Sequence, residues 1–262
     1  MSRIEKVFTR AGHTALIAYV TAGYPDTETT LKAVPLLAES GCDIIELGIP
    51  FSDPLADGVT IQNASYHALQ NGVTPSTCLE LAAKLREKVE IPLVFMSYYN
   101  PIYSYGIERF CEACRDSGVD GLIIPDLPPE EGGETETACR KNGLDLIYLL
   151  APTSNESRIR LATEHSSGFV YLVSVTGVTG TRSTLPTDLG TFIARVRRVS
   201  GKPLCIGFGI STPEQAVQAG SLADGVIVGS RIVQYLDSDP SCREAAAFVA
   251  GLREAMDMQD SE

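Results

Sequence analysis

Three acidic residues stand where they could do chemistry. Glu46 interrupts the apolar run DIIELG, and Asp53 and Asp57 lie on either side of Pro-Leu-Ala just after it. A buried charge is costly unless it is paired or used, so Glu46 is either half of a structural ion pair or a functional carboxyl group. An apolar pocket raises the proton affinity of a carboxyl group, as a general acid or base near neutral pH requires. Asp53 and Asp57 could instead fix a turn.

Glycines near the end of the chain indicate a phosphate site. The segments PLCIGFGIS and GVIVGSRIV each place glycine after an apolar run and before a helical pattern. Backbone N–H groups at a helix N-terminus bind phosphate without a basic side chain. The candidates are Gly207, Gly209, Gly229 and Ser230, although glycine there could serve turn geometry alone. Neither segment matches G-x-G-x-x-G or G-x-x-x-x-G-K-[ST], which disfavours dinucleotide and nucleoside triphosphate sites.

Histidine and cysteine offer no competing site. His13, His67 and His165 are expected at the surface or at helix ends. The chain has no G-x-S-x-G or H-E-x-x-H motif, so hydrolase and zinc-enzyme functions lose support. Its seven cysteines are an odd number, which predicts reduced thiols, and the C-x-x-C of Cys111 and Cys114 is interpreted as core packing. We therefore expect no metal in this chain.

Composition restricts the partners and the location. The 262 residues are 44% hydrophobic, and 21 basic against 33 acidic residues give a net charge of −12. Nucleic acid and anionic membranes both require a basic face, so neither is an expected partner. No apolar run approaches the roughly 18 residues that span a bilayer, and the first residues lack the apolar centre of a signal peptide. We predict a cytoplasmic protein, or a plastid stromal one if a transit peptide precedes this sequence.

Eight short apolar runs provide the scaffold for these residues. They are nearly continuously apolar, which is typical of parallel strands buried on both faces. Helical patterns with capping residues follow, for example over 26–41, 74–89, 155–166 and 187–201. No linker interrupts the series, so we predict a single-domain (β/α)8 TIM barrel over residues 1–262 with an extra N-terminal helix. A doubly wound sheet is the alternative. The runs begin at Ala15, Asp43, Pro92, Gly121, Asp145, Phe169, Pro203 and Gly225.

The barrel prediction places the candidate residues at one end. Segments that follow barrel strands lie at the carboxyl-terminal mouth, where active sites form. The segments after the second and sixth runs, 50–72 and 176–186, are long, and we expect mobile loops there. Aromatic residues at strand ends could line a pocket for a flat apolar group or fill the barrel: Tyr19, Tyr98, Tyr99, Tyr171 and Phe208.

Five motifs together resemble the tryptophan synthase alpha chain family. They are ELGIPFSDPLADGVTIQ, IIPDLP, VSVTGVTG, GFGIS and VIVGS, which occur in order over nearly the whole chain. The resemblance implies retro-aldol cleavage of indole-3-glycerol phosphate to indole and glyceraldehyde 3-phosphate. It also implies an alpha2beta2 complex in which indole passes to a beta chain that uses pyridoxal phosphate, with no cofactor in this chain.

The resemblance also implies site residues. Glu46 matches the catalytic acid–base carboxyl group, and Asp57 matches a carboxylate that accepts a hydrogen bond from the indole N–H. Val175 replaces an Arg of the family pattern, and Met96 replaces a Leu. Positions around the indole pocket or its closing loops correspond to Tyr19, Ile61, Met96, Tyr98, Ile123, Asp126, Tyr171 and Thr179. Phosphate-binding positions correspond to Gly180, Phe208, Gly209, Gly229 and Ser230.

Other functions stay open at this level. A stand-alone lyase that releases free indole would have the same active site. A non-catalytic barrel that regulates a partner enzyme is disfavoured because both carboxyl groups are present. Another sugar-phosphate isomerase or aldolase would require a Schiff-base lysine or a metal cluster at the strand ends, and none of the eight runs contains lysine.

Overall fold

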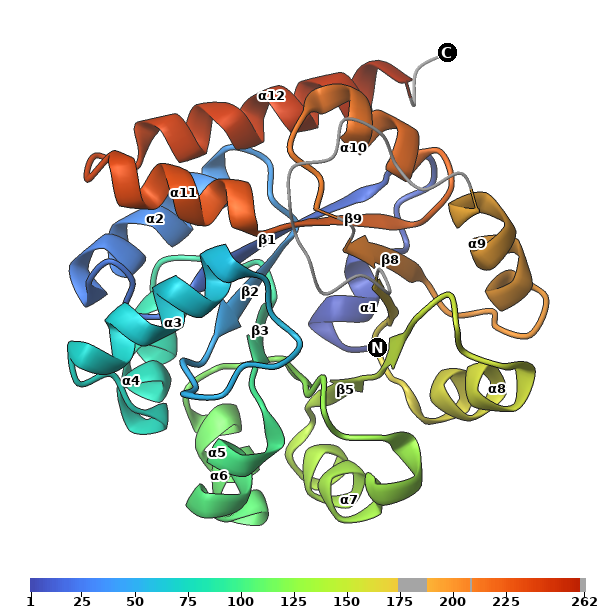
Figure 1. Ribbon diagram of the computed structural model, residues 1–262, viewed down its shortest axis with the longest axis horizontal. Helices are drawn as coiled ribbons and strands as arrows, with labels where there is room; N and C mark the ends of the chain where they lie inside the picture. The colour runs from blue at the N-terminus through green and yellow to red at the C-terminus, as the bar shows by residue number, and fades with distance from the viewer. Residues whose placement is uncertain (174–187, 208, 260–262) are drawn as a thin grey trace.

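Parallel strands form the centre of the molecule, in a computed structural model that describes residues 1–173, 188–207 and 209–259 (Figure 1). Hydrogen-bonded neighbours follow the order β5-β4-β3-β2-β1-β9-β8-β7-β6. The strands are β1 (Ala15–Thr21), β2 (Ile44–Gly48), β3 (Leu93–Met96), β4 (Gly121–Ile123), β5 (Asp145–Ile147), β6 (Leu149–Leu150), β7 (Val170–Val173), β8 (Leu204–Gly207) and β9 (Gly225–Val228).

The two ends of this order are parts of one strand. Only Tyr148 separates β5 from β6, and its carbonyl oxygen accepts a hydrogen bond from the N–H of Tyr171 at 3.1 Å. The sheet therefore closes, and the eight predicted runs occupy eight barrel positions. The predicted (β/α)8 barrel is confirmed. A doubly wound sheet, which would keep two open edges, is wrong.

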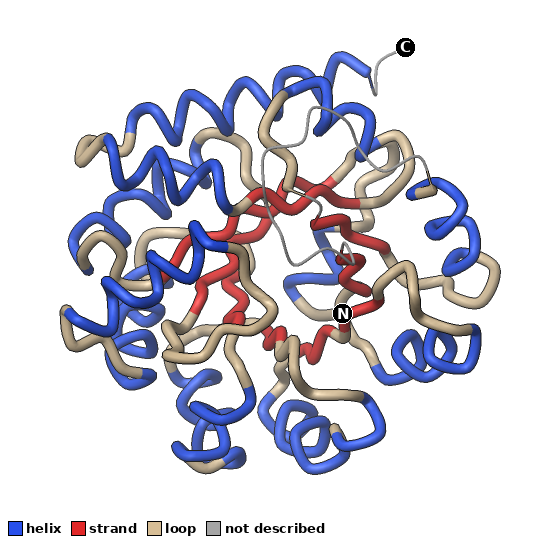
Figure 2. The backbone as a smooth tube through the Cα atoms, in the orientation of Figure 1, coloured by secondary structure: helices blue, strands red, loops and turns tan. Residues whose placement is uncertain are grey.

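Helices surround the barrel on all sides (Figure 2). The predicted helical segments correspond to four of them, and Asp26, Thr74 and Asn155 cap three through side-chain hydrogen bonds to backbone N–H groups. The helices after β1 are α2 (Thr27–Glu39), α3 (Val59–Gln70), α4 (Pro75–Arg86), α5 (Tyr99–Tyr105), α6 (Ile107–Asp116), the 3-10 helix η1 (Pro129–Glu131), α7 (Gly133–Asn142), α8 (Glu156–His165), α9 (Leu189–Arg197), α10 (Pro213–Gly220), α11 (Ser230–Ser238) and α12 (Arg243–Gln259).

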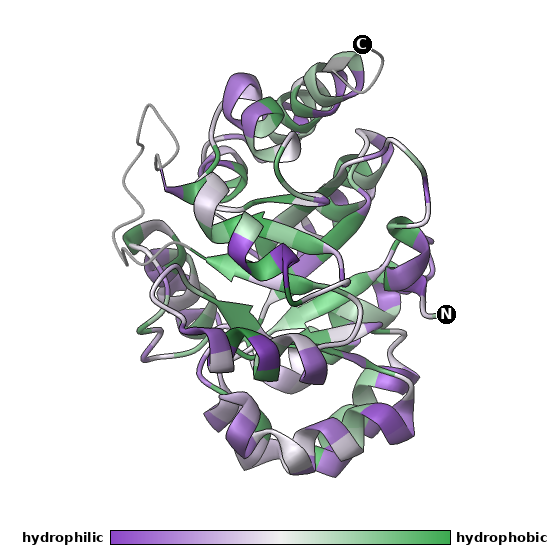
Figure 3. Cartoon of the chain, turned by 90° about the vertical axis from the view of Figure 1, so that its right-hand side faces the viewer, coloured by the Kyte–Doolittle hydropathy of each residue, from purple (hydrophilic) through white to green (hydrophobic). Residues whose placement is uncertain are grey.

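The strands are hydrophobic along their length (Figure 3), and residues on both of their faces are buried. Outward-facing residues pack against the helices in one large cluster. Inward-facing residues fill the barrel, as alternate positions along a strand must. The inner cluster contains Ile4, Ile17, Ile44, Val94, Ile123, Ile147, Phe169, Tyr171, Cys205 and Ile227.

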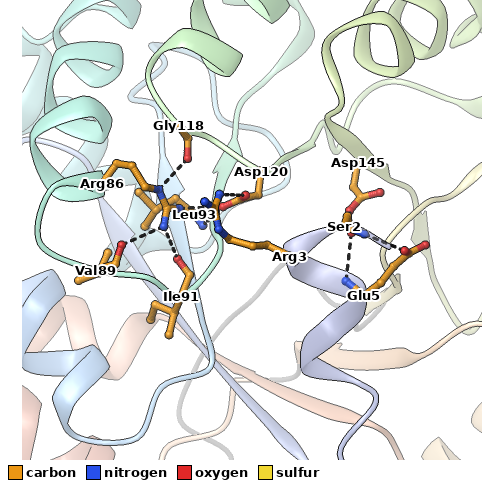
Figure 4. Close-up of polar contacts among 10 residues, drawn as sticks. All are labelled: Ser2, Arg3, Glu5, Arg86, Val89, Ile91, Leu93, Gly118, Asp120 and Asp145. Carbon is orange, nitrogen blue, oxygen red and sulfur yellow. Dashed lines mark hydrogen bonds and ion pairs between the residues drawn. The ribbon is translucent and has the colours of Figure 1, made fainter.

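The predicted N-terminal helix, α1 (Arg3–Val7), closes the barrel at the amino-terminal ends of its strands. Ile4 is fully buried in the inner cluster. The hydroxyl of Ser2 donates to Asp145 at 2.6 Å, and Arg3 forms an ion pair with Asp120 at 2.8 Å (Figure 4). Because this end is closed, only the carboxyl-terminal end of the barrel is available for a substrate.

The segment after β2 differs from the long loop that was expected. A loop over residues 49–58 leads into α3, in which Ile61, Ala64, Ser65 and Ala68 are buried. The expected loop is therefore a helix over residues 59–70, whose buried side chains pack on the barrel. The other expected loop, 176–186, lies outside the described residues.

Two other sequence expectations concern cysteine and membranes. All seven cysteines are free and buried, and Cys111 and Cys114 are core residues of α6, as predicted. Within the described parts of the chain, we find no helix with the length and apolar character needed to cross a bilayer.

Candidate active site

Glu46 faces the inside of the barrel near its mouth. It is paired with Tyr19 of β1 and with Val94 of β3, and its side chain is fully buried. Neither carboxyl oxygen has a hydrogen-bond partner among the described residues, so no described side chain forms the ion pair that was the alternative for Glu46. Burial, and then the negative charge of Asp57, raise its pKa from 4.5 to about 8. Glu46 is thus protonated at neutral pH.

Asp57 lies on the loop that follows β2 and is only partly buried. Burial raises its pKa from 3.8 to about 6, while a hydrogen bond from Tyr98 favours the ionised form. Asp57 is therefore mostly ionised at neutral pH, where Glu46 is not. Two nearby carboxyl groups with separated pKa values can act as an acid and as a fixed negative charge, respectively.

Two inward-facing tyrosines border Glu46 because glycine leaves room for their hydroxyl groups. A Cβ atom on Gly48 would be 2.1 Å from the hydroxyl oxygen of Tyr19, and one on Gly207 would be 2.6 Å from that of Tyr171. Burial is the largest cause that raises the pKa of both tyrosines, and the charge of Glu46 contributes to each. The tyrosines remain protonated and neutral, so they border the site as aromatic walls.

Apolar residues complete the walls at the mouth. Ile61 of α3 packs with Tyr19, and Met96 at the end of β3 contacts both this group and the inner cluster that holds Ile123 and Tyr171. The structure therefore brings together five of the residues predicted for the indole pocket. A flat apolar ring matches such a lining.

The glycines predicted to bind phosphate lie at the ends of β8 and β9. Gly209 has a φ of 69°, in the left-handed region that favours glycine. Gly229 is the N-cap of α11 and Ser230 is its first residue, and no side chain caps this N-terminus. Free N–H groups at a helix N-terminus suit an anion. Thr179, Gly180 and Phe208 lie outside the described residues.

Asp53 and two of the histidines lie apart from Glu46, and Asp126 lies at the edge of the site beside Tyr98 and Tyr99. Asp53 is exposed and accepts from the hydroxyl of Ser52 at 2.5 Å, which matches its turn-forming interpretation. Asp126 is exposed and accepts from the N–H of Tyr99 at 2.8 Å. His13 pairs with Asp43, and His165 with Glu136, both away from the mouth.

Two cavities lie away from Glu46 and Asp57. A cavity of about 560 Å³ beside Asp145 and His165, and one of about 870 Å³ between α2 and α12, are both lined by residues other than Glu46 and Asp57. No cluster of three or more His, Cys, Asp or Glu side chains that could hold a metal occurs in the described residues.

Sequence reasoning missed three residues that shape the site. Gly48 makes room for Tyr19, Phe51 packs its ring 5.2 Å from that of Tyr98, and the N–H of Ala56 donates to the Tyr98 hydroxyl at 2.8 Å. Only Gly48 left a signal, because it stands two positions after Glu46 and so shares its face of the strand. The contacts of Phe51 and Ala56 depend on loop geometry that no local pattern predicts.

A closed parallel barrel with a buried, protonated carboxyl group and an ionised one at its mouth is the arrangement of a TIM-barrel enzyme that transfers protons. Residues 6–260 match the family model described as tryptophan synthase alpha chain. The chain is 60% identical over 257 residues to the tryptophan synthase alpha chain of Dehalococcoides mccartyi, covering 98% of this chain and all of that one. It is 48% identical to the chain of the same name from Geobacter sulfurreducens, covering 98% and 99% of the two.

Solved structures agree. A tryptophan synthase structure from Mycobacterium tuberculosis superposes with a TM-score of 0.92 at 38% identity, over 97% of this chain and 98% of that one. The alpha subunit from Legionella pneumophila gives 0.90 at 35% identity, over 98% and 99% of the two. The chain belongs to the tryptophan synthase alpha chain family. Its reaction is the alpha reaction of tryptophan biosynthesis, the cleavage of indole-3-glycerol phosphate, which confirms the predicted carbon–carbon lyase.

Proposed function

We propose that Glu46 is the general acid and base of this cleavage and that Asp57 stabilises the charge that develops on the indole. The observation that carries the proposal is the fully buried Glu46 carboxyl group, which lacks a hydrogen-bond partner in the described structure and has a pKa of about 8. It enters the reaction with a proton to give. Asp57, with a pKa of about 6, enters it as an anion.

A single carboxyl group that first donates a proton and then accepts one is enough to balance the protons of the reaction. Glu46 donates its proton to C3 of the indole ring, which becomes a cation-like indolenine. The resulting carboxylate then takes the proton of the glycerol hydroxyl group as the carbon–carbon bond breaks, so Glu46 regains its starting state. Each step is a proton transfer that a carboxyl group can perform, and the reaction therefore requires no cofactor in this chain. Pyridoxal phosphate would belong to the beta chain.

Asp57 acts through its charge. Protonation of C3 places positive charge on the ring nitrogen, and an anion beside the N–H stabilises that charge more in the transition state than in the ground state. Tyr19, Tyr171 and Ile61 hold the ring between them. The phosphate binds at the other end, on backbone N–H groups at Gly209, Gly229 and Ser230, with the predicted Gly180 and Phe208 as further phosphate-binding positions.

We propose the beta chain as partner, in an alpha2beta2 complex in the cytoplasm, with residues 1–262 acting as one domain. Exposed apolar side chains on elements that follow β2 and β3 support a docking surface beside the mouth. Leu55 is 91% exposed, Val59 on α3 67% and Tyr103 on α5 65%. Large apolar side chains exposed on neighbouring elements mark interaction sites. A partner there would receive indole directly from the barrel.

The test is indole formation from indole-3-glycerol phosphate by the purified chain, alone and with a beta chain. Glu46→Gln should lower turnover at least about 100-fold because an amide cannot exchange the proton, and Asp57→Asn should also lose most activity. Asp53→Asn is the matched control because it changes an exposed turn residue of the same loop, and it should retain activity. Turnover of Glu46→Gln within about tenfold of the parent would overturn the acid–base role. Full activity without a partner would favour the stand-alone lyase.

A further inference from the structure

The loop that carries Asp57 has few contacts that hold it in place. Ile49 is tied to the end of β3 by its N–H to the carbonyl of Met96 at 2.8 Å, but within residues 51–58 the backbone hydrogen bonds are short-range, such as the N–H of Asp57 to the carbonyl of Pro54 at 3.1 Å. Ser52, Asp53, Leu55 and Ala56 are exposed. A catalytic carboxylate on such a loop requires an anchor, because a misplacement of about 1 Å can lower a rate 100-fold.

Tyr98 provides a fixed point beside this loop. It is the N-cap of α5, two residues after the end of β3, and is only 6% exposed. Its neighbour Ser97 donates its N–H to the carbonyl of Ile123 at 3.0 Å. The Tyr98 ring lies 5.2 Å from that of Phe51 at the start of the loop. Tyr98 is therefore anchored at the end of the barrel strand and contacts the loop from there.

Both hydrogen-bonding roles of this hydroxyl are directed at the loop. The oxygen accepts from the N–H of Ala56 at 2.8 Å. Its single proton is left free for the carboxylate of Asp57, whose pKa the Tyr98 hydroxyl lowers. A phenol hydroxyl has a single proton, so accepting from one group and donating to another fixes its orientation. The Tyr98 hydroxyl thereby links the end of β3 to two consecutive loop residues.

We propose that Tyr98 is a positioning residue: its hydroxyl ties Ala56 and Asp57 to the end of β3 and so holds the Asp57 carboxylate in place for the indole N–H. The inference rests on the proposed role of Asp57 and adds the element that orients it. The inference gives the Tyr98 hydroxyl a function, whereas lining an indole pocket would require only its aromatic ring.

The connection also affects protonation. Asp57 is surrounded by groups that oppose its ionisation or stay neutral: Glu46 on β2, Tyr19 on β1 and Tyr171 on β7. Burial raises the pKa of Asp57, and the hydrogen bond from Tyr98 is the interaction that lowers it. Removing the hydroxyl should therefore raise the pKa of Asp57 and reduce its ionised fraction at neutral pH.

The experiment compares Tyr98→Phe with Tyr105→Phe, which removes a hydroxyl from the other end of α5. The titration of the Asp57 carboxyl carbon is followed by NMR, and kcat/KM is measured against pH. Tyr98→Phe should move both the Asp57 titration and the acid limb of kcat/KM to higher pH, with a loss of about tenfold or more in kcat/KM at pH 7. Tyr105→Phe should change neither.

The outcomes separate the inference from the function on which it rests. An unchanged Asp57 titration, or a shifted titration with an unchanged acid limb, overturns the positioning role. If the parent chain does not cleave the substrate, the proposed function fails, while the NMR titration still decides whether Tyr98 holds Asp57. Should Tyr98→Phe not fold, amide hydrogen exchange of Ala56 in the parent decides: exchange as slow as that of strand amides supports the connection, and exchange at free-loop rates overturns it.

Discussion

The hydroxyl of Tyr19 lies directly over Gly48, at the position where any other residue would have its side chain. Tyr19 is paired with Glu46 across β1 and β2, so the residue two positions after Glu46 borders the same ring. A Cβ on Gly48 would be 2.1 Å from the hydroxyl oxygen and 2.6 Å from Cζ of Tyr19. The aromatic wall beside the catalytic carboxyl group thus depends on a missing side chain.

We therefore expect Gly48→Ala to displace the Tyr19 ring into the site. Overpacking of this kind costs about 1–3 kcal/mol of unfolding free energy, and kcat/KM should fall more than about tenfold. Gly190→Ala is the control, because a Cβ there would contact nothing within 4 Å. Adding Tyr19→Leu should restore part of the stability of Gly48→Ala; a Gly48→Ala variant as stable and active as the parent would contradict the geometry.

The pH dependence of kcat/KM should be bell-shaped, with its maximum near pH 7. Activity requires ionised Asp57 and protonated Glu46, whose pKa values are about 6 and about 8. Activity should fall below the first value as Asp57 gains a proton, and above the second as Glu46 loses its own. Steady-state kinetics from pH 5 to pH 10 checks this, and a flat profile between pH 5 and pH 9 would be inconsistent with both assignments.

Stability should also depend on the proton of Glu46. Its pKa is raised from 4.5 to about 8, so the folded state binds the proton more tightly than the unfolded state does. This stabilisation is complete below 4.5 and is lost as the pH rises through about 8. Between pH 6 and pH 9, Glu46→Gln should gain about 3 kcal/mol of unfolding free energy relative to the parent.

Urea unfolding at both pH values measures that difference. Glu28→Gln, at an exposed position of α2, is the control and should show no such gain. If Glu46→Gln and the parent respond equally to pH, Glu46 is not a buried protonated group.

Phosphate binding should depend more on the backbone than on side chains. Ser230→Ala should raise KM only a fewfold, about two to five times, because the helix N–H groups remain. Gly209→Val should weaken binding severely, since a φ of 69° is strained for a branched residue and the side chain would block close approach. Titration with glycerol phosphate, with Tm measured for each variant, tests this. Equal losses in the two variants would argue for a site made by side chains.

Hydrogen exchange should distinguish the two halves of the segment after β2. Residues 59–70 form α3 and should be protected in the chain alone, as should the Ala56 amide that donates to Tyr98, whereas residues 51–55 should become protected when substrate and a beta chain bind. A 30-fold activation by the partner would need only about 2 kcal/mol of preference for the ordered state. Equal exchange of residues 51–55 in all samples would count against closure on binding. The expected loop 176–186 can be followed in the same experiment.

The sequence by itself determined the (β/α)8 architecture and singled out Glu46 as a candidate catalytic residue. Eight apolar runs with helical patterns between them are compatible with few chain topologies. Parallel strands that are buried on both faces must each be joined to the next by a crossover connection. Glu46 could be singled out for the same local reason, since a carboxyl group in such a run is conspicuous. The motif ELGIPFSDPLADGVTIQ, which contains Glu46, also predicted Asp57 as a site residue and indicated the family.

Only the tertiary structure decided how these residues meet. The room that Gly48 leaves for Tyr19 follows from the pairing of β1 with β2, and the contact of Tyr98 with Ala56 joins residues 42 positions apart. Helix α1 closes the barrel because Ser2 and Arg3 contact Asp145 and Asp120, which stand at the starts of distant strands. Such contacts arise from strand register and barrel closure, which bring together residues that share no local pattern. The sequence therefore predicts which residues could react, and the closed barrel determines which of them face one another.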